Sequence, residues 1–155
     1  MATKSKKAAA SSGQKAPLRP SELSPQEALI YVMVLTSAVD RNMNDTELQR
    51  IGNIVHNYPA FKGIDSNLLT HIAEDCAEVL NGPGGVEHML ALIETALPAK
   101  LRETAYAFAV EVAAVDLKVV VEELEFLDLL AGRLHLDRLV VTAIERSARA
   151  RHQTV

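Results

Sequence analysis

Apolar residues recur at helical spacing along most of the chain. The first such segment has one apolar face, formed by Leu29, Val32, Met33, Thr36 and Val39. Ser24 and Glu27 precede it with the spacing of a capping box, in which each side chain satisfies an unpaired backbone N–H group of the other residue. Pro25 suits the first helical position, so the sequence predicts a helix that begins directly after Ser24.

Polar, proline and glycine residues divide the following sequence into further helices. The predicted breaks lie at residues 40–45, Tyr58-Pro59, 81–85 and Pro98. Asn44 and Glu47 repeat the capping-box spacing and predict the start of a second helix. A third helix is expected from Asp65, a fourth from about Val86, and a fifth after Pro98.

The sequence after Pro98 resembles the sequence after Ser24. With a shift of 76 positions, 38–40 (Ala-Val-Asp) falls on 114–116 (Ala-Val-Asp), and Glu47 falls on Glu123. With four residues removed, Asp65 falls on Asp137. A three-helix unit is therefore predicted twice, at about 24–80 and 99–150, joined by a linker and bridging helix at 81–97. The predicted fold is an all-α bundle of about seven helices in one domain at 21–150.

Length and composition exclude several classes of protein. The 155 residues suit a single domain, and a lone cysteine, Cys76, excludes an internal disulfide framework. The apolar runs near the start are too short for a membrane span, and the run at 105–121 is interrupted by charged residues. The first 20 residues have no apolar core of signal-peptide length. These features predict a cytoplasmic protein without a membrane span.

The net charge of −4 conceals an uneven distribution. Residues 1–20 carry five basic residues and no acid, and residues 146–155 carry three more basic residues. The sequence between them holds the other 8 basic residues and all 20 acids. We expect 1–20 to be a disordered tail, either a solubilising segment or an electrostatic arm, and 146–155 to be a disordered or frayed end. Because the acidic body repels polyanions, no nucleic-acid partner is predicted.

Each predicted unit places an Asp at the end of its first helix and a Glu seven residues later. These pairs are Asp40 with Glu47 and Asp116 with Glu123. An Asp at a helix C-terminus opposes the helix dipole at a cost of about 0.3–1 kcal/mol, so its recurrence needs a reason. The acids either cap the next helix or supply hard oxygen ligands to a divalent cation. The spacing leaves both interpretations open.

The first corner also imitates part of a calcium-binding EF-hand loop. Asp40, Asn42 and Asn44 match loop positions one, three and five. Position six requires Gly and is Asp45, and position twelve requires Glu and is Ile51. An EF-hand is therefore rejected.

This duplicated order of an Ala-Val-Asp helix end, a polar loop and a helix beginning near a Glu resembles the tellurite-resistance TerB-like family. The resemblance covers about residues 24–150. It implies an all-α cytoplasmic protein of the tellurite or stress response, without enzymatic activity, that binds a divalent metal ion. The family's acids fall on Asp40, Glu47, Asp116 and Glu123.

The remaining polar residues suggest structural roles. Glu111 lies beside an apolar face and is expected to form an ion pair with an Arg or Lys of another helix. Cys76 is expected to be buried, and Glu122, Glu123, Glu125 and Asp128 to form a mostly solvated face. The five histidines show no metal-binding spacing, and no nucleophile or phosphate-loop motif is present, so no enzyme is predicted.

The alternative function is a metal-free module for protein–protein interaction. A partner helix would lie in a groove between the two three-helix units. A homo-oligomer is also compatible with the sequence.

Overall fold

The computed structural model describes residues 23–39, 44–114 and 121–155, and these residues form helices and connecting turns without strands. The α-helices are α1 (Pro25–Ala38), α2 (Asp45–Asn57), α3 (Leu69–Asn81), α4 (Gly85–Ala96), α5 (Arg102–Ala114), α6 (Val121–Arg133) and α7 (Arg138–Arg151). Short 3-10 helices are η2 (Pro59–Phe61), η3 (Ser66–Leu68) and η4 (Ala99–Leu101). The predicted all-α fold is confirmed.

Both predicted capping boxes are present. At α1, the N–H of Glu27 donates to Ser24 Oγ at 3.1 Å and the N–H of Ser24 donates to Glu27 Oε2 at 2.8 Å. At α2, the N–H of Glu47 donates to Asn44 Oδ1 at 3.0 Å and the N–H of Asn44 donates to Glu47 Oε2 at 3.3 Å. These starts were predictable because a capping box depends on residues three positions apart.

The third helix begins four residues later than expected from the sequence, and the fourth begins one residue earlier, at Gly85. Asp65 caps the 3-10 helix η3, where its Oδ1 accepts the N–H of Asn67 at 3.0 Å, and α3 begins only at Leu69. At the turn between α3 and α4, Gly84 has a φ of 84°. This left-handed conformation favours glycine, so the glycine-rich break has a direct structural reason.

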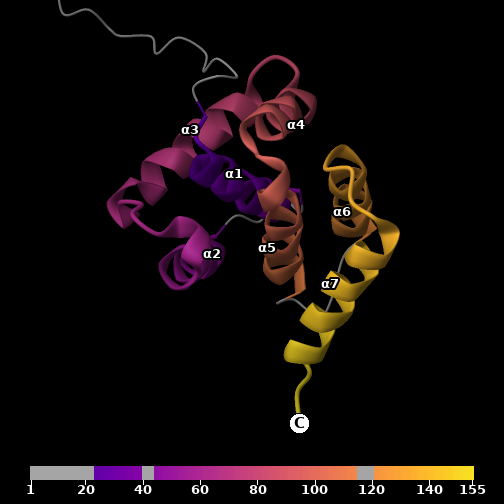
Figure 1. Ribbon diagram of the computed structural model, residues 1–155. Coiled ribbons are helices and arrows are strands. Elements are labelled where there is room, and N and C mark those ends of the chain that lie inside the picture. Colours follow the sequence, from indigo (N-terminus) through magenta and orange to yellow (C-terminus); the bar gives the residue numbers. More distant parts are fainter. Residues whose placement is uncertain (1–22, 40–43, 115–120) are drawn as a thin grey trace, which may run out of the picture.

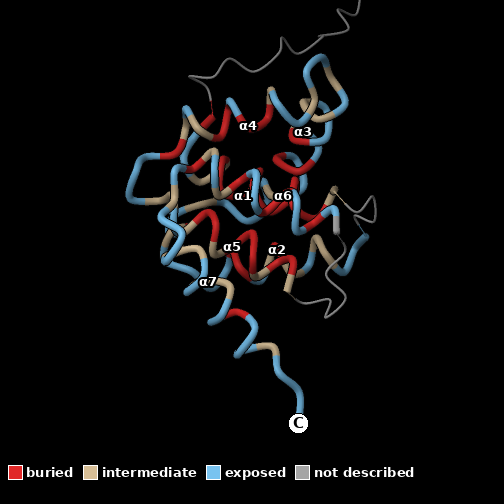
Figure 2. The backbone as a smooth tube through the Cα atoms, turned by 90° about the vertical axis from the view of Figure 1, so that its right-hand side faces the viewer, coloured by how far each residue is buried: buried red, intermediate tan, exposed pale blue. Residues whose placement is uncertain are grey.

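Helix α1 is buried around its whole circumference. Every residue from Ala28 to Ser37 is buried, rather than the single face predicted from periodicity (Figure 2). A helix that is apolar all round belongs at the centre of a fold. Figure 1 shows α1 in this position, with α2, α3 and α4 around it and α5 beside it.

Helix α5 is the second central element. It packs most extensively against α1 and then against α7, and α6 lies beside it as well. In Figure 1, α6 and α7 lie on the side of α5 that faces away from most of α1 to α4. Helix α6 also contacts α1 and α4, which joins the C-terminal helices to the rest of the bundle. Within the described ranges, no helix is both long and apolar enough to cross a membrane.

Candidate functional site

At the first acidic corner, the structure describes one of the two predicted ligands, Glu47, and this residue caps helix α2. Glu47 is the third residue of α2, and its Oε2 accepts the N–H of Asn44 in the capping box. Asp40 lies outside the described residues. The geometry of Glu47 therefore agrees with the structural interpretation of this acid, and the predicted pairing with Asp40 stays a prediction. Ile51 is fully buried, which agrees with the rejection of an EF-hand.

At the second acidic corner, the structure describes one of the two predicted ligands, Glu123, and its side chain is buried. Glu123 is the third residue of α6 and is only 7% exposed. The expectation that it shares a solvated face with Glu122, Glu125 and Asp128 was wrong for Glu123 and right for the other three, which are exposed. Periodicity placed it among polar residues, but α6 turns this side chain into the protein. Asp116 lies outside the described residues.

Of the four predicted metal ligands, two are thus placed by the structure. Among the residues that the structure describes, no group of three or more His, Cys, Asp and Glu side chains is arranged to hold a metal ion. The predicted cation sites include Asp40 and Asp116, which lie outside the described residues, so the metal site stays a prediction.

Two further predictions from sequence are confirmed. Glu111, at 2.7 Å from Arg151 Nη2, forms an ion pair between α5 and α7, and its other oxygen lies 2.9 Å from His152 Nε2. Burial alone would raise the pKa of Glu111, but the hydrogen bonds from Arg151 and His152 outweigh it and lower the pKa. Cys76 is fully buried, and this burial raises the pKa of its thiol to about 12.

The pairing of Glu111 also corrects the expected C-terminus. Residues 146–155 were expected to be disordered or frayed, but α7 continues to Arg151 and is held to α5 by Arg151 and His152. Basic residues in the last turn suit the negative end of the helix dipole. Arg151 and His152 therefore hold the C-terminal end of α7 against α5.

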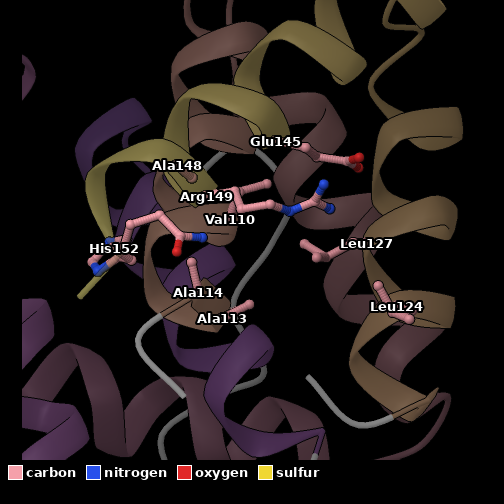
Figure 3. A pocket seen from close by; sticks show the side chains of 10 residues that line it. Val110, Ala113, Ala114, Leu124, Leu127, Glu145, Ala148, Arg149 and His152 are labelled. Atoms are coloured by element: carbon pink, nitrogen blue, oxygen red, sulfur yellow. The ribbon is translucent and has the colours of Figure 1, made fainter. Parts of the chain in front are cut away.

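The structure also contains a groove that the sequence did not predict. A cavity of about 320 Å³ lies between α5, α6 and α7 (Figure 3). Its lining residues are Val110, Ala113, Ala114, Leu124, Leu127, Glu145, Ala148, Arg149, His152 and Gln153. They come from α5, α6, α7 and the two residues that follow α7. The relative positions of these segments depend on tertiary packing, so no local sequence signal identifies the lining residues.

Comparison with known proteins adds no identification. No protein-family model matches the chain, and neither a curated protein nor a solved structure matches it. The TerB-like resemblance therefore depends on the repeated residues described above.

Proposed function

We propose that this chain is a non-enzymatic, cytoplasmic TerB-like protein of the tellurite or stress response. In this proposal it consists of a duplicated three-helix unit and binds a divalent cation at the corresponding acidic corners. Asp40 and Glu47 belong to the first corner, and Asp116 and Glu123 belong to the second.

The helix bounds support the duplication. Helices α2 and α6 both have 13 residues, and both of their ends are offset by 76 positions, as in the sequence repeat. Helices α1 and α5 end at positions with the same offset. Asp65 and Asp137 correspond after the four-residue deletion, and each caps the N–H two residues later, at 3.0 Å and 2.8 Å. Repeated capping chemistry at repeated positions is the result expected from an ancestral duplication.

The observation that carries the cation proposal is the burial of Glu123 at the position equivalent to Glu47. Water screens a buried carboxylate poorly, so its charge interacts strongly with any charge nearby. A divalent cation shared with Asp116 would neutralise two carboxylates at once. It would supply electrostatic stabilisation of the corner and a link between metal concentration and protein stability.

The residue types at the two corners supply hard oxygen donors. In the last turn of α1, three positions before Asp40, Ser37 is 3% exposed and its hydroxyl has no hydrogen-bond partner among the described residues. In this proposal the Ser37 hydroxyl would be a further oxygen ligand, beside the carboxylates of Asp40 and Glu47. Oxygen donors without His or Cys favour Ca²⁺, Mg²⁺ or Mn²⁺ over Zn²⁺.

Calorimetric titration of the full chain with Ca²⁺, Mg²⁺, Mn²⁺ and Zn²⁺ tests this proposal. We expect binding heat with at least one of the first three ions and a concentration-dependent rise in melting temperature. The paired variants Asp40→Asn with Glu47→Gln, and Asp116→Asn with Glu123→Gln, should each remove the binding of one corner. Glu122→Gln with Asp128→Asn is the matched control, since both acids are exposed on α6.

Two results would contradict the proposal. One is the absence of heat and of any melting shift with all four ions. The other is equal binding by the wild type and by a protein carrying all four corner substitutions. Either result would leave the metal-free interaction module as the better description.

A further inference from the structure

The groove between α5, α6 and α7 has an apolar floor. Val110, Ala113 and Ala114 of α5 form its base, and Leu124 and Leu127 of α6 form one wall (Figure 3). Leu124 is 53% exposed, so apolar surface remains open to solvent on this wall. A concave apolar surface with few polar groups is the usual form of a small-ligand site.

The positively charged side chain of Arg149 extends over this apolar floor. Figure 3 shows the Arg149 side chain reaching from α7 toward α6. Arg149 forms no side-chain hydrogen bond or ion pair with a described residue, in contrast to Arg133 and Arg151, which both pair with acids. Its planar guanidinium offers a fork of donors that matches a carboxylate.

Each of the two nearby acids has a hydrogen-bond partner, and only Glu145 lines the groove. Glu145 Oε1 accepts the hydroxyl of Tyr106 at 2.6 Å, and Glu111 is bound by Arg151 and His152. Gln153 also lines the groove and supplies an uncharged amide donor on the α7 side. The donors that remain available in the groove therefore suit an anionic head group.

We propose that this groove binds a small amphipathic carboxylate. The apolar part of the ligand lies along Val110, Ala114 and Leu127, and the carboxylate is bound by the Arg149 guanidinium with the Gln153 amide as a second donor. The cavity holds on the order of ten water-sized volumes, which suits a short aliphatic or a single-ring acid. This site shares no residue with the acidic corners, so it is independent of cation binding.

The test uses ¹⁵N-labelled full-length protein and three probes with the same tail, namely octanoate, 1-octanol and octylammonium. We expect saturable amide shifts at Val110, Ala113, Ala114 and Leu127 with octanoate at millimolar concentration or below. Octanol should bind the same residues more weakly, and octylammonium should bind more weakly still because Arg149 repels it. Equal or tighter binding of octylammonium would overturn the proposed charge preference.

Three variants separate the head-group contact from the apolar contact. Arg149→Gln should weaken octanoate binding about tenfold and leave octanol unchanged, because it removes a charge-assisted hydrogen bond. Arg146→Gln is the matched control, since Arg146 is exposed on the same helix and does not line the groove. Leu124→Gln should weaken both octanoate and octanol. An unchanged octanoate affinity in Arg149→Gln, or the absence of shifts in the groove of the wild type, would refute the proposal.

Removing the charge of Glu145 should change octanoate affinity in the opposite direction to removing the charge of Arg149. Glu145→Gln retains an oxygen that can accept the Tyr106 hydroxyl but removes a negative charge from the groove lining. It should tighten octanoate binding and leave octanol binding unchanged. Weaker octanoate binding in a variant that melts like the wild type would contradict an anionic ligand.

Discussion

Arg133 is expected to be the main electrostatic link between α6 and α4. Its Nε and Nη2 donate to the two carboxylate oxygens of Glu94 at 3.1 Å and 2.9 Å, and its Nη1 donates to Glu87 Oε2 at 2.7 Å. The side chains of Arg133 and Glu94 are 27% and 31% exposed, whereas Glu87 is mostly exposed. The forked contact with Glu94 should therefore provide most of the energy.

The coupling energy between Arg133 and Glu94 follows from this geometry. Exposed ion pairs contribute up to about 1 kcal/mol, and hydrogen bonds to charged groups contribute about 1.5–3 kcal/mol. Because this ion pair is bidentate and its side chains are about one-third exposed, we expect a coupling free energy of about 1–2 kcal/mol. For a domain of this size, that energy corresponds to a loss of about 2–8 °C in melting temperature.

A double-mutant cycle measures this coupling. Urea unfolding of the wild type, Arg133→Met, Glu94→Gln and the double variant gives the four free energies of unfolding. Met retains the apolar stem of the arginine, and Arg146→Met controls for the loss of an exposed arginine. A coupling below about 0.3 kcal/mol, or an equal loss in Arg146→Met, would refute the reasoning.

The same pair gives a pH dependence with a defined sign. The hydrogen bond from Arg133 lowers the pKa of Glu94 below its ordinary value in the folded protein. The resulting stabilisation is complete above the ordinary Glu pKa of about 4.3 and is lost as pH falls through the lowered folded pKa. The stability difference between wild type and Arg133→Met should therefore be greatest near neutral pH and shrink on acidification.

Two further predictions concern the core and a helix cap. Cys76 should not react with a thiol reagent at neutral pH in the folded protein, because the thiol is fully buried and its pKa is raised to about 12, and it should react completely after unfolding in guanidinium. Asp137→Ala should lower the free energy of unfolding by about 1 kcal/mol through loss of the Leu139 N–H bond, while Asp137→Asn should retain most of the stability. Rapid labelling of folded Cys76, or equal stability of the two Asp137 variants, would contradict these expectations.

Features that depend on near neighbours in sequence were predictable, and those that depend on tertiary packing were not. The capping boxes at Ser24 and Asn44 require residues three positions apart, so the sequence contains the whole interaction. The complete burial of α1 depends on the helices that surround it, and periodicity predicted only one apolar face. The partner of Glu111 could be predicted by type, but its identity as Arg151 required the packing of α7 on α5.

The groove shows the same limit for function. Arg149 belongs to a basic C-terminal segment that composition alone assigns to a flexible end. Its position over an apolar floor depends on α5, α6 and α7 being placed together. Composition therefore shows that this segment is basic, and only the fold shows that Arg149 lies at an apolar groove.

The unequal burial of Glu47 and Glu123 predicts which corner binds a cation more tightly. Both are the third residue of their helix, but Glu47 is partly exposed and caps α2, whereas Glu123 is buried. Water screens charges less in a buried site, so a carboxylate there attracts a cation more strongly. We therefore expect Glu123→Gln to weaken cation binding more than Glu47→Gln.

Lys118 lies two positions after Asp116 in the sequence, and its positive charge provides a test of the cation proposal. If a divalent cation binds at the second corner, Lys118→Met should leave binding unchanged or tighten it by removing a like charge. Weaker cation binding in Lys118→Met, or no cation binding at this corner in the wild type, would contradict the proposal.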